Sequence, residues 1–466
     1  MRRLPLLLAV LGLLVGMSAS TAQASKFVTG FADPLFSSPS ANSRETALSD
    51  AVATHASIAR LGVSWRAIAP AIPPAGFQAS NPASTGYNWE RLDTAVRSVT
   101  AHGLKVLLVV SNAPTWAEGP SRPATAAAGT WNPNPTAFEA FATAIATRYS
   151  GAFTVPTGGV LPGVHLFEAW NEPNLSNYLT PQWEGMKPIS ADIYRNLLNA
   201  FYAGIKSVQP TATVVGGSLA PFGDRPGGER VPPVIFTREL FCFRGGELIK
   251  LACPQPARLD AFSHHPIAVG PPTESAASEF DATTPDLGRL THVLQKAEAT
   301  KQVLPAGKKP LWVTEFWYDS DPPDPTGVSL ARQARWYEQD LYSFWKQGAS
   351  VAICLQVIDA PQGKSYSETF QSGVYFLDGT AKPSQTAMAF PFVAHRESPF
   401  KVGIWGIAPH RGKVRVQALR KGRWTTIATV AAKGPGRPFT ASLKLLRFAN
   451  LRARLGALNS LSWSQR

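Results

Sequence analysis

Long apolar runs are nearly absent from this 466-residue sequence, and the one that exists lies at its start. Residues 1–24 begin with Arg2 and Arg3, continue through LPLLLAVLGLLVGM, and end in an Ala-x-Ala pattern at Ala24. This order predicts a secretory signal peptide cleaved after Ala24. An N-terminal membrane anchor is the alternative, but the run is shorter than the ~20 residues that span a bilayer. We therefore expect a secreted, extracellular protein without a transmembrane segment.

Cysteine is also scarce. The sequence has three cysteines and no C-x-x-C pair, which argues against a zinc ribbon and against a redox dithiol. Cys242 and Cys253 are eleven positions apart, so a local disulfide is one expectation and two free thiols are the other. Cys354, inside the apolar run SVAICLQVID, is expected to be a buried thiol.

Acidic residues are almost missing from the last part of the chain. Between Arg396 and Arg466 there are 15 Lys and Arg but a single acid, Glu397. The rest of the chain has no net charge, because it contains 30 of the 45 Lys and Arg and 30 of the 31 Asp and Glu. We expect this basic tail to contact an anionic glycan or the cell envelope. The alternative is a basic surface that only packs against the neutral body.

The body, residues 25–395, alternates short apolar runs with longer amphipathic stretches, as parallel strands connected by helices do. Strands are predicted at 26–32, 58–65, 104–110, 164–170, 212–218, 259–265, 311–317 and 350–358. Helices are predicted between them, for example over 88–103, 134–149, 190–208 and 330–348. Eight such units predict an α/β fold of the closed (β/α)8 TIM-barrel type. An open doubly wound sheet is the rival, but no Gly-x-Gly-x-x-Gly turn follows the first strand.

The pattern changes to period two in the tail. Alternating runs occupy 413–419, 423–430, 438–445 and 451–458, separated by turn-forming segments such as RKG and KGPGRP. This alternation predicts a small antiparallel β-sandwich domain over residues 396–466.

Polar residues at the ends of apolar strands are the candidates for chemistry, because the carboxyl ends of barrel strands surround the active site. Asn171 and Glu172 end the fourth predicted strand, and Glu315 lies in the seventh. Two glutamates at one barrel mouth can cleave a glycosidic bond, one as proton donor and the other as nucleophile. Glu172 and Glu315 are therefore the predicted catalytic residues, and Asn171 would hold a sugar hydroxyl.

Other residues at strand ends are predicted to bind substrate. Arg66 follows the second strand and is expected to keep Glu315 ionised. His265 ends the sixth strand and is expected to position the nucleophile and the sugar. Trp116 and Trp317 either stack on sugar rings or belong to the core.

The adjacent histidines His264 and His265 raise the question of a metal. Neighbouring residues of a strand face opposite sides, and no third ligand lies nearby in the sequence. We therefore expect no metal site.

The segments around both glutamates resemble those of a known superfamily. WNEPN at 170–174 and VTEFWY at 313–318 are similar to the acid/base and nucleophile strands of the retaining glycoside hydrolases of clan A. The likeness covers residues 27–395 and is nearest to the cellulase-like and xylosidase/iduronidase-like branches. It implies a (β/α)8 barrel with catalytic glutamates on strands four and seven.

Two departures from this superfamily concern the sugar-binding subsite. Ile267 stands where a tyrosine is expected after His-Pro, and Gln356 stands at the eighth strand where many members have tryptophan. Because of this position, the resemblance implies that Gln356 binds substrate, and the identity of the sugar stays open.

Together these features predict a secreted retaining O-glycosyl hydrolase that cleaves a plant or microbial polysaccharide or oligosaccharide by double displacement. Such an enzyme needs neither metal nor cofactor. A transglycosylase on the same barrel and an inactive carbohydrate-binding protein are the alternatives. A nucleic-acid partner is not expected, because it fits poorly with export.

Overall fold

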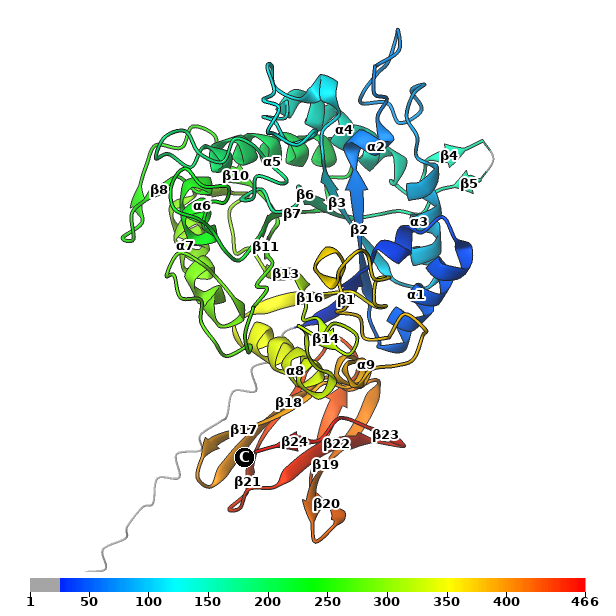
Figure 1. Ribbon diagram of the computed structural model, residues 1–466, viewed down its shortest axis with the longest axis vertical. Helices are drawn as coiled ribbons and strands as arrows, with labels where there is room; N and C mark the ends of the chain where they lie inside the picture. Colours follow the sequence, from blue (N-terminus) through cyan, green and yellow to red (C-terminus); the bar gives the residue numbers. More distant parts are fainter. Residues whose placement is uncertain (1–25, 157, 466) are drawn as a thin grey trace, which may run out of the picture.

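Eight parallel strands form a closed barrel at the centre of the molecule (Figure 1). The computed structural model describes residues 26–465 except 157, so the predicted signal peptide lies outside the described residues. The barrel strands are β1 (Val28–Ala32), β2 (Ile58–Ser64), β3 (Lys105–Ser111), β6 (Leu166–Ala169), β7 (Thr213–Leu219), β11 (Ala261–His264), β13 (Leu311–Phe316) and β16 (Ala349–Leu355). Their order around the ring is β1-β16-β13-β11-β7-β6-β3-β2. The predicted strands and the barrel fold are confirmed.

Helices surround the ring and connect its strands (Figure 1). They are α1 (Ala41–Ala53), α2 (Trp65–Ile68), α3 (Glu90–Ala101), α4 (Pro135–Arg148), α5 (Ile189–Val208), α6 (Pro233–Leu240), α7 (Leu287–Thr300), α8 (Leu330–Lys346) and α9 (Pro383–Ala389). The four helices predicted by example correspond to α3, α4, α5 and α8. Among the described residues, no helix is long and apolar enough to cross a membrane.

Local sequence sets the ends of these helices. The Asn134 side chain accepts a hydrogen bond from the Ala137 amide at 3.0 Å, and Pro135 occupies the first helical position of α4. After α3, Gly103 has a φ of 74°, a left-handed conformation that glycine adopts without steric cost. Such signals are short-range, which is why the helices could be found from the sequence.

The barrel interior is layered. The layer nearer the amino ends of the strands is apolar and includes Ile58, Leu166, Ala261 and Trp312. Two residues further along the same strands, the side chains on the same side are polar: Arg60, Glu168, Ser263 and Thr314. The interior therefore changes from apolar to polar towards the carboxyl ends of the strands.

The connecting segments carry short two-stranded ladders: β4 (Thr154–Val155) with β5 (Gly159–Val160), β8 (Phe243–Arg244) with β9 (Ile249–Lys250), β10 (Ala257–Arg258) with β12 (Val303–Leu304), and β14 (Ser320–Asp321) with β15 (Val328–Ser329). Cys242 and Cys253 form a disulfide across the β8–β9 segment, with their Cα atoms 5.8 Å apart. Cys354 is free and buried, as expected, and burial raises the pKa of its thiol.

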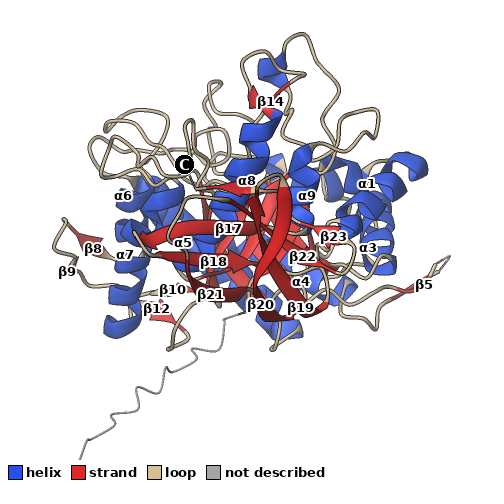
Figure 2. Cartoon of the chain, turned by 90° about the horizontal axis from the view of Figure 1, so that it is seen from below, coloured by secondary structure: helices blue, strands red, loops and turns tan. Residues whose placement is uncertain are grey.

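Two antiparallel sheets make up the C-terminal sandwich. One contains β17 (Phe392–Ser398), β18 (Lys401–Gly406) and β21 (Phe439–Lys444), and the other contains β19 (Arg411–Arg420), β20 (Arg423–Lys433), β22 (Asn450–Leu455), β23 (Leu458–Asn459) and β24 (Trp463–Ser464). The sandwich packs against the flank of the barrel at α8 (Figures 1 and 2). Trp405 of β18 contacts Tyr342 and Trp345 of α8, with ring centroids 5.8 and 6.0 Å away. The antiparallel C-terminal sandwich is confirmed, but its first strand begins at Phe392, so the predicted boundary at residue 396 falls inside β17.

Candidate functional site

Glu172 lies at the barrel mouth, in a turn that follows the end of β6. Trp170 and Glu172 have φ values of 66° and 40°, and such left-handed conformations cost non-glycine residues about 1–3 kcal/mol each. Backbone hydrogen bonds of 2.9 Å hold the turn, from the Trp170 amide to the Val110 carbonyl and from the Glu172 amide to the Ser218 carbonyl. Neighbouring strands thus fix a strained turn that carries the Glu172 carboxylate.

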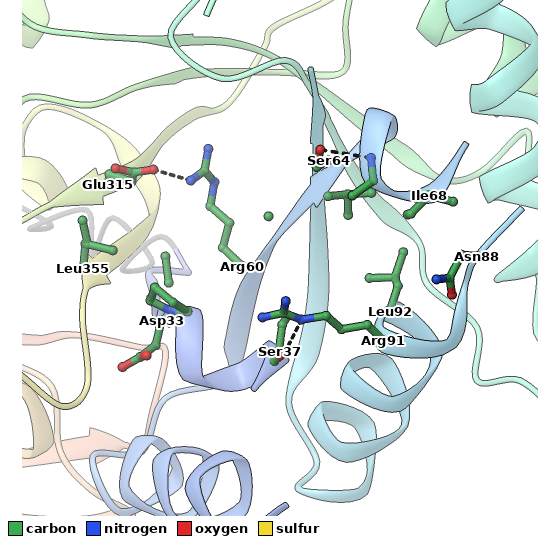
Figure 3. A pocket seen from close by; sticks show the side chains of 15 residues that line it. Asp33, Ser37, Arg60, Ser64, Ile68, Asn88, Arg91, Leu92, Glu315 and Leu355 are labelled. Carbon is green, nitrogen blue, oxygen red and sulfur yellow. Dashed lines mark hydrogen bonds and ion pairs between the residues drawn. The ribbon is translucent and has the colours of Figure 1, made fainter. Parts of the chain in front are cut away.

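Glu315 lies in β13 and forms an ion pair with Arg60 of β2 (Figure 3). The same guanidinium donates to Glu168 from Nε at 2.7 Å and to the Asn171 Oδ1 from Nη2 at 2.8 Å. Burial alone would raise the pKa of Glu315, but electrostatic interactions with His265 and Arg60 hold it below its ordinary value. Glu315 is therefore a carboxylate stabilised in its ionised form.

His265 joins the two glutamates. Its Nδ1 lies 3.0 Å from the Glu172 Oε1 and 3.9 Å from the Glu315 Oε2. Its Nε2 lies 3.1 Å from both the Ser218 Oγ and the Thr314 Oγ1. One oxygen of Glu172 and one of Glu315 lie within 4.8 Å of each other, so the carboxylates face each other closely.

Glu168 supports this arrangement from the buried layer below. Its Oε1 accepts hydrogen bonds from the Ser263 Oγ at 2.7 Å and the Thr314 Oγ1 at 3.0 Å, while its Oε2 binds Arg60. Burial would lower the pKa of Arg60, but the carboxylates of Glu168 and Glu315 raise it above its ordinary value. The guanidinium is thus permanently charged and held in one orientation.

Tyr178 also belongs to the site. Burial, together with the nearby side chains of Glu172 and Glu315, raises the pKa of Tyr178 to about 12. The indole Nε1 of Trp170 donates to the Tyr178 carbonyl at 2.9 Å. Tyr178 therefore lies close to both glutamates, while the Asn171 side chain is held by Arg60.

The prediction that Arg66 lies beside Glu315 is wrong. The chain leaves β2 at Ser64, whose hydroxyl accepts from the Ala67 amide at 3.3 Å and caps the short helix α2. Arg66 lies in that helix, and its Nη1 reaches the Ala128 carbonyl at 3.4 Å instead. Arg60, within the strand, occupies the place beside Glu315.

Three other candidates lie around the mouth. Trp116 is half-buried and donates from Nε1 to the Pro70 carbonyl at 2.9 Å. Trp317 meets the Phe370 ring edge-on, with centroids 4.9 Å apart, and Gln356 donates to the Phe370 carbonyl at 2.9 Å. Among the contacts of the described residues, none joins these three side chains to a glutamate, so their role in substrate binding stays a prediction.

The sequence does contain a signal for Arg60. A charge inside the apolar strand IARLGV is unusual, and Glu168 inside HLFEA supplies the opposite charge. The rule that functional residues lie at strand ends does not identify either residue, because both lie in strand interiors. Tyr178 lies in a connecting segment, and nothing in the local pattern distinguishes it.

A cavity of about 520 Å³ opens beside Glu315 and Arg60 (Figure 3). Its wall also contains Asp33, Asn88 and Arg91, and its size lies within the ordinary range of about 300–1,000 Å³ for small-ligand sites. Asp33 accepts hydrogen bonds from the amides of Leu35, Val357 and Ile358, and burial raises the pKa of Asp33 to about 6. The cavity offers room for a small polar ligand next to Glu315.

Glu172, His265 and Glu315 also have the spacing of a metal site, since one ligand atom of each lies within 4.8 Å of the others. The expectation of no nearby third ligand overlooked this grouping, because the three residues are distant in sequence. Arg60 already pairs with Glu315, and its fixed charge opposes a cation there. His264 faces away, with its Nε2 2.8 Å from the Ala282 carbonyl, and burial lowers its pKa to about 3.

Neither a family model nor a curated protein matches this sequence. Solved structures match in fold. A family 39 glycoside hydrolase from the gut symbiont Bacteroides cellulosilyticus WH2 is 15% identical with a TM-score of 0.55, over 91% of this chain and 82% of that chain. A glucosidase from Croceicoccus marinus is 13% identical with a TM-score of 0.51, over 91% and 94%. At these identities the likeness concerns architecture: this chain has the (β/α)8 barrel fold of those glycoside hydrolases.

Proposed function

We propose that this protein is a retaining O-glycosyl hydrolase. The observation that carries the proposal is the unequal surroundings of two facing carboxylates. Glu315 is paired with Arg60, whereas the Glu172 carboxylate contacts His265 at 3.0 Å and lacks an arginine among the described residues. One oxygen of each carboxylate lies within 4.8 Å of the other, which fits the separation of about 5–5.5 Å in retaining enzymes better than about 6.5–9.5 Å in inverting ones.

The unequal surroundings assign the two roles. Glu315, kept ionised, attacks the anomeric carbon while Glu172 donates its proton to the leaving oxygen, and the glycosidic bond breaks. In the second step water attacks the same carbon, its proton passes to Glu172, and the bond to the Glu315 oxygen breaks. Asn171, held by Arg60, would bind a sugar hydroxyl.

The proposal includes the substrate and the place of action. The cavity beside Glu315 would hold part of a plant or microbial polysaccharide or oligosaccharide. The start of the chain, with its predicted cleavage after Ala24, supports export. The basic C-terminal domain supports an anionic glycan as a partner.

The test compares Glu315→Ala and Glu172→Ala on aryl glycosides. Glu315→Ala should lose turnover, and added azide should restore it with inverted anomeric configuration, because azide then attacks in place of the carboxylate. Glu172→Ala should still cleave substrates with good leaving groups and should give a retained azide product. Product configuration is read by NMR, and treatment of the wild type with a chelator should leave its rate unchanged.

Glu184→Ala is the matched control, since Glu184 is an exposed glutamate in the segment that follows β6. It should retain the wild-type rate. Equal residual activity of the two site variants on every substrate would contradict the role assignment. A wild type that binds oligosaccharides but turns over none of them would instead indicate a carbohydrate-binding protein.

A further inference from the structure

The outer face of the five-stranded sheet concentrates positive charge. Arg415 of β19 lies directly opposite Arg454 of β22, and Arg411 of β19 lies directly opposite Lys433 of β20. Lys413 lies between Arg411 and Arg415 on the same side of β19. We call these five residues, together with Arg452, the basic face.

Strand alternation separates this face from the sandwich core. Val414, Val416 and Ala453 are fully buried, whereas Lys413, Arg415 and their basic neighbours alternate with them and reach solvent. The single acid of the tail, Glu397, lies on β17 in the other sheet and accepts a hydrogen bond from Ser442 at 2.7 Å. Within the part of the chain that the structure describes, no carboxylate forms an ion pair with the basic face.

This arrangement is unfavourable for folding alone. Like charges directly opposite each other on antiparallel strands destabilise a sheet. A surface that serves only solubility can intersperse both signs and avoid this cost. The basic face is therefore better explained by a ligand than by stability.

We propose that the basic face binds an anionic polysaccharide. Along β19 its cations recur every second residue, about 7 Å apart, and adjacent strands are about 4.8 Å apart. Such a regular array suits a polymer with repeated charges. The identity of the polymer rests on the proposed function, because the same chain carries facing carboxylates beside a cavity of about 520 Å³.

Two features of the face disfavour other polyanions. The Arg452 guanidinium lies over one face of the Trp424 ring, 4.3 Å from its centroid, so that face cannot stack on nucleic-acid bases. The side chains between the cations are small or polar, for example Thr429 and Gln417, and offer nothing to insert into a membrane. Exposed Phe400, Leu446 and Phe448 lie on loops outside the face, so a vesicle comparison is still required.

The test uses two matched triple variants of the full chain. Lys413→Gln/Arg415→Gln/Lys433→Gln removes three charges from the basic face. Arg420→Gln/Lys421→Gln/Arg423→Gln removes three charges from the tip of the β19–β20 hairpin, and all six side chains are exposed. Binding is measured as retention on immobilised polygalacturonate and as the NaCl concentration that elutes the protein.

The face variant should bind polygalacturonate roughly tenfold more weakly, since each exposed charge pair contributes a few tenths of a kcal/mol to about 1 kcal/mol. Its melting temperature should stay the same or rise, because the repulsion across β19 is relieved. The hairpin variant should be retained like the wild type. Retention of the wild type should fall between 0.1 and 1 M NaCl, as the Debye length shrinks from about 10 to about 3 Å.

Equal weakening by both triple variants would overturn the proposal, because net charge rather than the face would then explain retention. Stronger retention on DNA or on phosphatidylserine vesicles would overturn the assignment to a polysaccharide. Glu315→Ala should be retained like the wild type, so failure of turnover and failure of binding are separate results.

Discussion

Arg60 shows how one side chain organises the candidate site. It contacts Glu168, Glu315 and Asn171 at once, and two of these carry negative charge. Because a charged group inside a barrel is stable only when its partners are fixed, each of these residues restricts the others. The site is therefore a buried network with one cation at its centre.

Arg60→Met should move the acid side of the pH–activity profile. In the wild type the pKa of Glu315 is depressed, so its ionised form persists until the pH falls through that low value. Without the guanidinium the pKa of Glu315 rises, and activity should be lost at a pH about 1–3 units higher. The measurement is kcat/KM against pH.

Two further variants keep this prediction testable. Arg60→Lys retains a positive charge and should shift the profile less than Arg60→Met. Arg66→Met should leave the acid limb where it is, because Arg66 does not contact Glu315. An unchanged acid limb in Arg60→Met would show that Arg60 does not control Glu315. Urea unfolding should show a loss of about 3–5 kcal/mol for Arg60→Met, as expected when one partner of a buried ion pair is removed.

The rule of strand ends finds the residues at the barrel mouth, and it misses Arg60, which pairs with Glu315 and Asn171 from inside β2. Asn171, Glu172, His265 and Glu315 follow from one rule, because backbone position alone brings strand ends to the mouth. Arg60 lies in the strand interior, and its long side chain carries the charge upwards to Glu315. Sequence position therefore locates short side chains well and long ones poorly.

At the scale of elements, α8 is shared by the barrel and the sandwich. Its residues Tyr342 and Trp345 pack on Trp405, and its Arg335 lies over the Trp463 ring at 3.8 Å. The strands and helices were predictable because their periodicity is local. Which helix the sandwich would cover was not predictable, since that choice depends on contacts between distant segments.

Trp405→Ala should destabilise the barrel as well as the sandwich. Trp405 is fully buried, and a Trp→Ala change in a core costs about 3–5 kcal/mol. Calorimetry should show one transition at a lower temperature, with activity lost in the same range. Phe400→Ala, an exposed aromatic in the same sandwich, should have little effect. A separate early transition with barrel activity intact would mean that the two parts are uncoupled.

For the whole molecule, this coupling bears on how the basic tail can be studied. Removal of residues after 395 would delete Trp405 and expose the face of α8 that it covers. A shortened chain would therefore lose stability together with positive charge. Substitutions on the basic face separate these two effects, which a truncation cannot do.

The barrel closes where β1, its first strand, pairs with β16, its last, and hydrogen bonds hold the chain at both ends of β1. Directly before β1, the Phe27 amide donates to the Gly436 carbonyl in the sandwich at 2.9 Å. Directly after β1, the Asp33 carboxylate accepts hydrogen bonds from the Val357 and Ile358 amides that follow β16, at 2.9 and 3.2 Å.

These hydrogen bonds join a segment that the ribosome makes early to segments that it makes late. The first strand cannot acquire its final partner until most of the chain exists, and contacts of such long sequence separation form slowly. We expect β1 amides to gain protection from hydrogen exchange together with those of β16 in pulse-labelled refolding, and earlier protection of β1 would contradict this. If the ring closes last, the barrel sheet of the nascent polypeptide stays open until β16 has been synthesised.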